Sequence, residues 1–129
     1  IQNVKFNSSL EMSELIKEMY KFDALFLSLS KEYSHTIPAK FQFYLSLGIP
    51  IIGILDGYLK KLINDKNVGF ASNSDDIYSF ENNLYNFSNL SINNKKNIAE
   101  NAYQLYQSNF SKKNALNKFY NIINEENNN

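Results

Sequence analysis

The feature that most constrains this 129-residue chain is the stretch from Asp23 to Gly57, which reads DALFLSLSKEYSHTIPAKFQFYLSLGIPIIGILDG. Two short apolar runs, ALFLSL and PIIGIL, lack the alternation of a half-exposed strand and are typical of parallel strands that are covered on both faces. Between them, Pro38 suits the first turn of a helix, which tolerates a missing N–H, and Gly48 suits its left-handed exit. The stretch therefore predicts a strand, a helix and a second, parallel strand.

This topology also predicts where a ligand would bind. Parallel sheets bind their ligands in the crevice beyond the carboxyl ends of the strands. We therefore expect function in the loops that follow Leu29 and Leu55, with the start of the proline-led helix close to both.

Further helices and strands are expected on both sides of this unit. Ser8 and Glu11 have capping-box spacing, and Asp56 is a suitable N-cap for the helix after the second strand. The expected strands cover 3–6, 24–29, 50–55 and 68–71; the expected helices cover 9–20, 38–47, 58–65 and three later segments that open at Asn73 or Ser74, at Ser91 and at Ser111. Strands that alternate with helices and are followed by several helices predict an α/β fold with a parallel sheet, flanking helices and a helical C-terminus.

Length and sheet size bear on the domain organisation. Residues 1–124 are expected to form one domain, and 125–129 a disordered tail, because EENNN has nothing to bury. So few strands would leave at least one edge of the sheet uncovered. This predicts that residues preceding Ile1 belong to the same sheet, with self-association at the open edge as a further hypothesis.

Composition excludes several classes of function. Lys and Arg together balance Asp and Glu at 13 each, and the basic residues are spread along the chain, so no nucleic-acid partner is expected. Cysteine is absent and His35 is the single histidine, so neither a disulfide framework nor a metal site is expected. No apolar run is long enough to cross a bilayer and the first residues do not resemble a signal peptide, which favours the cytoplasm.

The central stretch resembles a known family. The segment IPAKFQFYLSLGIPIIGILDG, preceded by DALFLSL and followed by LKKLINDKNVGF, resembles the C-terminal, donor-binding domain of GT-B glycosyltransferases of retaining family 4. That family carries a pattern of the type PsKxxEyxaxGxPvia after a buried strand. The matching residues here are Pro38, Lys40, Tyr44, Gly48 and Pro50, followed by Gly57 and Gly69. The likeness covers almost all of residues 3–123, in order.

The resemblance implies a Rossmann-like sheet that binds a nucleotide-diphosphate sugar, without a cofactor or a protein-bound metal. It further implies transfer of the sugar to a glycan or lipid-linked acceptor in bacterial surface polysaccharide synthesis, either in the cytoplasm or at the inner face of the membrane by peripheral association. In family members the final helix often crosses to the other lobe, which predicts exposed Phe119 and Tyr120 here.

Two departures from the family pattern qualify this function. The family commonly has two glutamates eight positions apart, and the matching positions here hold His35 and Phe43, with Gln42 as a substitute that could offer an amide to a hydroxyl. The chain also has no counterpart of the acceptor lobe and of the earlier strands, so the isolated chain is expected to be inactive. The alternative is a non-catalytic GT-B-like binding or assembly module.

The candidate donor-binding residues come from the loop before the proline-led helix, from that helix and from the end of the second strand. They are Ser34, His35, Thr36, Ile37, Lys40, Gln42, Asp56 and Gly57. Each also has a plain structural interpretation: His35 as an exposed loop residue, Lys40 as a solvated lysine and Asp56 as a helix N-cap. No nucleophile with a paired base is evident, so no catalytic residue is assigned.

Overall fold

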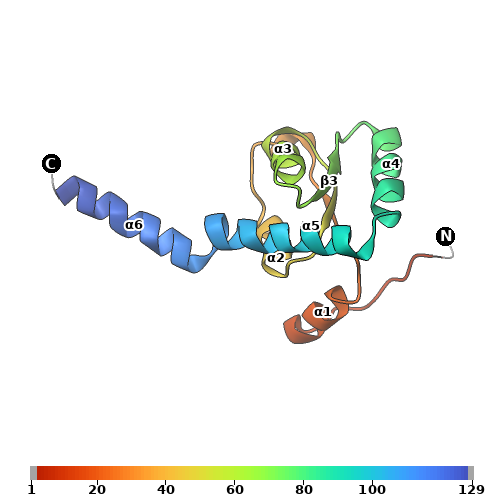
Figure 1. Ribbon diagram of the computed structural model, residues 1–129, viewed down its shortest axis with the longest axis horizontal. Coiled ribbons are helices and arrows are strands. Elements are labelled where there is room, and N and C mark those ends of the chain that lie inside the picture. The colour runs from red at the N-terminus through yellow and green to blue at the C-terminus, as the bar shows by residue number, and fades with distance from the viewer. Residues whose placement is uncertain (1–2, 128–129) are drawn as a thin grey trace.

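A computed structural model describes residues 3–127, with side chains as far as residue 125, and it confirms the α/β fold class (Figure 1). The strands β1 (Leu25–Ser28), β2 (Ile51–Ile54) and β3 (Gly69–Ser72) form one parallel sheet in the order β1-β2-β3. The helices are α1 (Met12–Met19), α2 (Ala39–Ser46), α3 (Gly57–Asp65), α4 (Ile77–Ser88), α5 (Ile92–Leu105) and α6 (Lys112–Asn127). A 3₁₀ turn, η1 (Lys31–Tyr33), follows β1, and a π-helical turn, η2 (Tyr106–Phe110), joins α5 to α6.

The three strands are in step with one another. At the start of the sheet, Leu25 of β1 pairs with Ile51 of β2, and Ile51 pairs with Gly69 of β3. At its end, Ser28 pairs with Ile54, and Ile54 pairs with Ser72. Because all three strands run parallel, the loops that follow them emerge from one edge of the sheet. This common edge, which we call the carboxyl rim, is where the sequence predicted a ligand site.

Apolar residues cover both faces of the sheet. On one face the strands pack against α2, α3 and α5, and on the other against α4, which Figure 1 shows standing beside β3. The fully or nearly fully buried residues of the larger core are Leu27, Phe41, Leu45, Ile51, Leu55, Leu59, Leu62, Ile63, Val68, Ala71, Ala102 and Leu105. The expected two-sided burial is thus confirmed for the central strand β2, whose residues from Ile51 to Gly53 are buried. It was wrong for β1, where Phe26 and Ser28 are exposed because this strand lies at an edge of the sheet.

The helix between β1 and β2 begins and ends as its sequence predicts. Pro38 is the N-cap residue of α2, and Gly48, just beyond the last turn, has a φ of +63°. That left-handed conformation costs a residue with a Cβ but not glycine. Phe41 and Leu45, four positions apart on one face, are fully buried and hold α2 against the sheet.

The N-terminal expectations were less accurate. Residues 3–6 do not form a strand, and the capping box is not made, since α1 begins at Met12 with Glu11 as its N-cap residue and no side-chain cap bond. The segment does not pair with any described strand, and its apolar side chains Val4 and Phe6 remain 52% and 92% exposed, so it buries too little apolar surface to be held in the sheet.

The later helices mostly begin where serine caps were expected. Ser91 accepts the Asn94 N–H at the start of α5, and Ser111 accepts the Asn114 N–H at the start of α6. The expectation for α4 was wrong, because Asp76 caps this helix by accepting the Ser79 N–H at 2.9 Å.

The C-terminal expectation was also partly wrong. Helix α6 continues to Asn127, so residues 125–127 are helical and not part of a disordered tail, while 128–129 lie outside the described residues. Once the cap at Ser111 has nucleated this helix, adding further turns is inexpensive even for polar residues. Between residues 3 and 127, no helix combines the length and the apolar character needed to cross a bilayer.

Candidate functional site

The loops after β1 and β2 lie side by side on the carboxyl rim. The Leu29 N–H donates to the Ile54 carbonyl at 3.2 Å, and the Leu55 N–H donates to the Ser72 carbonyl at 3.0 Å. These bonds carry the strand pairing one residue beyond each strand. The chain therefore leaves β1, β2 and β3 at neighbouring points, as the sequence predicted for the first two.

Two of the candidate residues touch directly across the rim. Gly57, the first residue of α3, has a φ of +75°, and a Cβ added there would collide with the carbonyl oxygen of Ser34. Both the backbone conformation and the contact therefore require glycine at this position. The contact fixes the loop after β1 against the start of α3.

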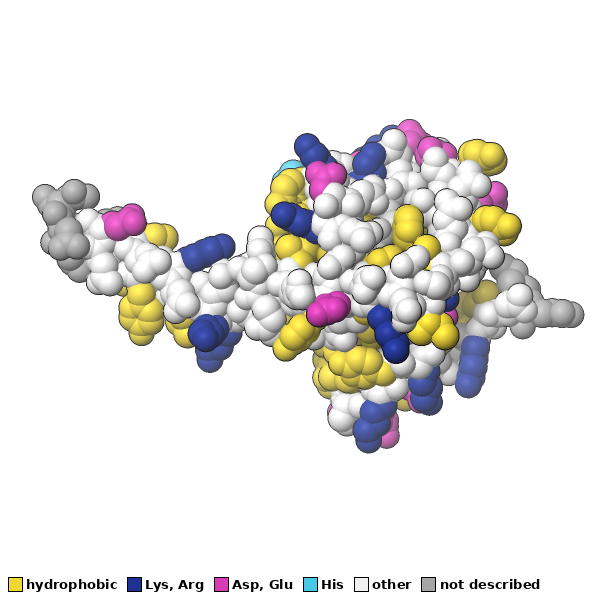
Figure 2. Space-filling view, viewed as in Figure 1, with side chains coloured by type: hydrophobic (Ala, Val, Ile, Leu, Met, Phe, Trp, Pro, Cys, Tyr) yellow, Lys and Arg dark blue, Asp and Glu magenta, His cyan; other side chains and the backbone are white. Residues whose placement is uncertain are grey.

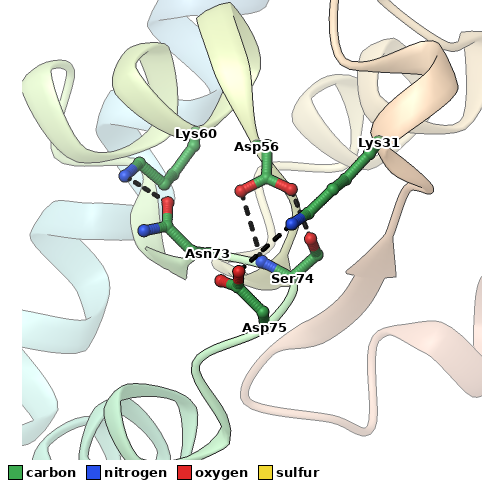
Figure 3. A network of polar contacts seen from close by, with 6 residues as sticks. All are labelled: Lys31, Asp56, Lys60, Asn73, Ser74 and Asp75. Carbon is green, nitrogen blue, oxygen red and sulfur yellow. Dashed lines mark hydrogen bonds and ion pairs between the residues drawn. The ribbon is translucent and has the colours of Figure 1, made fainter.

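A polar network joins the three rim loops (Figure 3). Both carboxylate oxygens of Asp56 accept hydrogen bonds from Ser74, one from its N–H at 3.3 Å and one from its hydroxyl. Lys31 from η1 pairs with Asp75 at 3.1 Å, and Lys60 from α3 donates to the Asn73 side chain at 2.7 Å. The loop after β3 is thereby tied to the loops after β1 and β2.

These contacts change the interpretation of Asp56. Asp56 occupies the N-cap position of α3, as expected, but its side chain makes no cap bond to that helix. Its carboxylate instead binds Ser74, whose hydroxyl is the main cause of a pKa below the ordinary value; the Ser74 N–H and the nearby Lys31 and Lys60 act in the same direction. The carboxylate is therefore held in its charged form at the rim.

Lys31 is a residue that sequence reasoning missed. Its hydrogen bond and ion pair with Asp75 raise the pKa of its ammonium group above the ordinary value, although the side chain is largely exposed. Lys60, Ser74 and Asp75 were missed as well. A signal for these residues was available in the sequence. They lie one to four residues beyond a strand or early in the next helix, and side chains at such positions gather at the carboxyl edge of a parallel sheet.

The loop before α2 uses part of its hydrogen-bonding capacity internally. The Ser34 N–H donates to the Lys31 carbonyl at 3.1 Å, and the Thr36 N–H and hydroxyl both donate to the Tyr33 carbonyl. A phosphate cradle made of all the expected backbone amides is therefore not preformed. The first hydrogen bond within α2 runs from the Phe41 N–H to the Pro38 carbonyl. The N–H groups of Ala39 and Lys40 come before it and have no partner within the helix, so they are the donors that the start of α2 offers to a ligand.

The structure separates the two candidate residues of α2. Lys40 and Gln42 are two positions apart, which is about 200° around a helix, so their side chains point to opposite flanks. Lys40 is exposed, as the donor-site hypothesis requires, but it lies beside an apolar hollow of 470 Å³ between α1 and α2. His35 is exposed in the loop. Ser34, Asp56 and Gly57 are thus brought together, and Lys40 and Gln42 are not.

The chemistry available at the rim is electrostatic. Within residues 3–127 no group of three or more His, Cys, Asp and Glu side chains is placed to hold a metal ion. Ser72, which ends β3, has a buried hydroxyl with no hydrogen-bond partner among the described residues. The rim therefore offers hydroxyls, lysine ammonium groups and helix starts, which suit an anionic, hydroxyl-rich ligand.

Comparison with known proteins adds no assignment. The chain matches no protein-family model, no curated protein and no solved structure.

Proposed function

We propose that this chain is the donor-binding part of a glycosyltransferase that moves a sugar from a nucleotide-diphosphate sugar to a glycan or lipid-linked acceptor. The observation that supports it most is the direct contact between Ser34 and Gly57, which brings the loops after β1 and β2 together where a parallel sheet binds ligands. The family resemblance implies that the donor lies at this same edge.

The rim has the electrostatic character that a diphosphate would need. Helices α2 and α3 both begin there, so their N–H groups and the positive ends of their dipoles face the rim. Lys31 and Lys60 supply two ammonium groups, each now bound to one exposed partner, Asp75 or Asn73. Exposed pairs of this kind exchange partners at little cost in free energy, so the lysines can turn to a phosphate.

In this mechanism the protein stabilises the leaving group. Breakage of the bond between sugar and diphosphate places negative charge on the phosphate oxygens, and the backbone N–H groups at the helix starts, together with lysines that turn to the phosphate, lower the barrier. No group that would accept the acceptor's proton, and no acceptor site, is assigned among residues 3–127. We therefore expect no sugar transfer by the isolated chain, measured with a panel of nucleotide-sugars and acceptors; turnover would contradict this.

The alternative is a non-catalytic module of the same architecture. His35 and Phe43 stand where the resembling family has glutamates, and Phe43 packs in a minor apolar cluster with Met19 and Leu25, so it offers no group to a ribose. This observation favours a site that binds nucleotide weakly or not at all.

Titration of the ¹⁵N-labelled chain followed by NMR tests the proposal. UDP, GDP and their glucose and mannose conjugates are added separately, and we expect saturable shifts of the amide signals of Ser34, Ile37 and Gly57. Lys60→Ala should weaken the response several-fold through loss of a phosphate contact, whereas Lys66→Ala, beyond the far end of α3, should not.

The outcomes separate the two functions. Shifts that cluster at the rim and weaken in the Lys60 variant support the donor site. An unchanged spectrum with all four ligands at millimolar concentration, or shifts confined to residues away from the rim, would overturn it in favour of the non-catalytic module.

A further inference from the structure

The side chain of Lys31 reaches across the carboxyl rim from one outer strand of the sheet to the other. Lys31 begins η1, just beyond β1, and its ammonium group binds Asp75 in the loop after β3 at 3.1 Å. Strand β2 lies between those two strands, and neighbouring strands are about 4.8 Å apart, so the bridge spans roughly 10 Å across the end of β2. Figure 3 shows it next to Asp56, which follows β2 and is close enough for the two charges to interact. The ion pair therefore lies where a parallel sheet binds its ligand.

The polar network of the rim is electrically neutral in the absence of a ligand. Its two lysines, Lys31 and Lys60, are matched by two carboxylates, Asp56 and Asp75. A phosphate that approaches the network therefore meets attraction and repulsion of similar size, as long as both carboxylates stay in place.

The two carboxylates are held very differently. Both oxygens of Asp56 accept hydrogen bonds from Ser74, and these bonds lower its pKa. Asp75 is held by its ion pair with Lys31, and the two side chains are 70% and 64% exposed. Because water competes strongly for exposed charges, such a pair separates easily. Of the two carboxylates, Asp75 is therefore the one that a ligand can displace.

Lys60 provides a contrast within the same network. It donates to the side-chain oxygen of Asn73 at 2.7 Å, and this acceptor carries no charge. A phosphate can bind Lys60 without separating opposite charges, whereas it has to replace a carboxylate in order to bind Lys31. Competition with the ligand is thus concentrated on Asp75.

We propose that Asp75 is an internal competitor of the ligand: its carboxylate holds Lys31 across the end of β2 until a phosphate group displaces it. Because the displacing group is the diphosphate of the donor, this role of Asp75 rests on the proposed function. When Lys31 turns to the phosphate, Asp75 is released while Ser74 stays bound to Asp56, so the loop after β3 opens on one side only. Asp76, which caps α4, follows directly, so the release also affects the start of that helix.

Titrations of the ¹⁵N-labelled chain with UDP and with inorganic pyrophosphate, followed by NMR, test the role of Asp75. Asp75→Asn keeps the size of the side chain and removes its charge, and it should tighten the binding of both ligands about two- to fivefold. Asp65→Asn removes the same charge from an exposed position at the far end of α3 and should leave the affinity unchanged. In the wild-type chain the amide signals of Asp75 and Ile77 should shift together with those of the rim.

A double variant separates competition for Lys31 from general repulsion of the ligand. In Lys31→Ala the carboxylate of Asp75 has no lysine to occupy, so the gain from Asp75→Asn should largely disappear in this background. All the substituted positions are exposed, so the variants are expected to fold. An equal gain in the wild-type and Lys31→Ala backgrounds would overturn the proposal.

The outcomes also distinguish a failure of this role from a failure of the donor site. If UDP binds at the rim but Asp75→Asn binds it no more tightly than the wild type, the role of Asp75 is wrong and the donor site stands. If pyrophosphate binds more tightly to Asp75→Asn while no nucleotide or nucleotide-sugar shifts the rim signals, the role of Asp75 stands and the donor site is wrong. If neither UDP nor pyrophosphate shifts those signals at millimolar concentration in any variant, both are wrong.

Discussion

At the scale of single residues, Asp56 shows how one side chain serves the rim. It ends the connection from β2 and precedes α3, yet its carboxylate binds Ser74 in the loop after β3. It therefore fixes the relative positions of two loops that are 18 residues apart in sequence. Its charge state consequently matters to the stability of the fold.

This leads to a prediction about acid stability. Because the Ser74 hydroxyl holds the pKa of Asp56 below its ordinary 3.8, the folded chain binds this proton less tightly than the unfolded chain. The stabilisation is complete above pH 3.8 and is lost as the pH falls through the lower folded pKa. In Asp56→Asn the free energy of unfolding, measured in urea from about pH 5 to pH 2, should fall less steeply with acid. Asp65→Asn, an exposed carboxylate of α3, is the matched control, and identical slopes for Asp56→Asn and wild type would contradict this.

Gly57 gives a second prediction at this scale. Gly57→Ala forces a Cβ into a left-handed conformation and against the Ser34 carbonyl, so we expect the free energy of unfolding to fall by about 1–3 kcal/mol. Tyr58→Ala, at the next and exposed position, should change it by less than about 0.5 kcal/mol. Urea unfolding followed by circular dichroism measures both, and equal effects of the two substitutions would show that Gly57 is not required.

At the scale of elements, the connection between α3 and β3 carries a structural device of its own. The side-chain amide of Asn64, in the last turn of α3, donates to the Ala71 carbonyl and accepts the Ala71 N–H. These two hydrogen bonds replace those that a neighbouring strand would make. Exposed strand edges are a general hazard for sheet proteins, and natural proteins cover or block them. Here one amide side chain blocks the β3 edge.

Replacing this amide should be costly. Asn64→Ala leaves the N–H and C=O of Ala71 without their partner, and we expect a loss of about 1–3 kcal/mol in the free energy of unfolding. Asp65→Ala, the adjacent exposed position, is the control and should be close to neutral. Hydrogen exchange of the Ala71 amide provides a local readout, and its unchanged protection in Asn64→Ala would contradict the assignment.

At the scale of the whole molecule, α6 stands apart from the sheet. Figure 1 shows it projecting away from the rest of the chain, and Figure 2 shows apolar side chains along it. Phe119 and Tyr120, which were expected to be exposed, are 59% and 61% exposed. Leu116 and Ile123 continue the same helical spacing, so α6 carries an uncovered apolar stripe.

Removal of this helix should therefore leave the domain intact. A chain that stops after Ala115 keeps the bond between Ser111 and the Asn114 N–H and loses only the exposed part of α6. We expect its free energy of unfolding to differ from that of the full chain by less than about 0.5 kcal/mol, measured by urea denaturation. A loss of more than about 1 kcal/mol would show that α6 packs on the domain in solution.

Features of the fold that depend on residues close in sequence could be predicted, and features that depend on distant residues could not. Strand β1, helix α2 and strand β2 could be predicted because apolar runs, an N-terminal proline and a glycine exit act within a few residues. The donor-binding roles of Lys40 and Gln42 stay a prediction, because a position in the sequence motif does not state which flank of a helix faces the rim.

The sequence by itself therefore determined the order of the main helices and strands from α1 onward, the parallel sheet and the adjacency of the loops after β1 and β2. Only the tertiary structure decided that Asp56 binds Ser74, that Lys31 joins the rim, that residues 3–6 form no strand and that Asn64 covers the edge of β3. The physical reason is the distance along the chain over which each interaction acts. Helix caps and the apolar periodicity of a helix or strand depend on residues that are close in sequence. The partner of a carboxylate, or of a strand edge, is chosen by three-dimensional packing among residues distant in sequence.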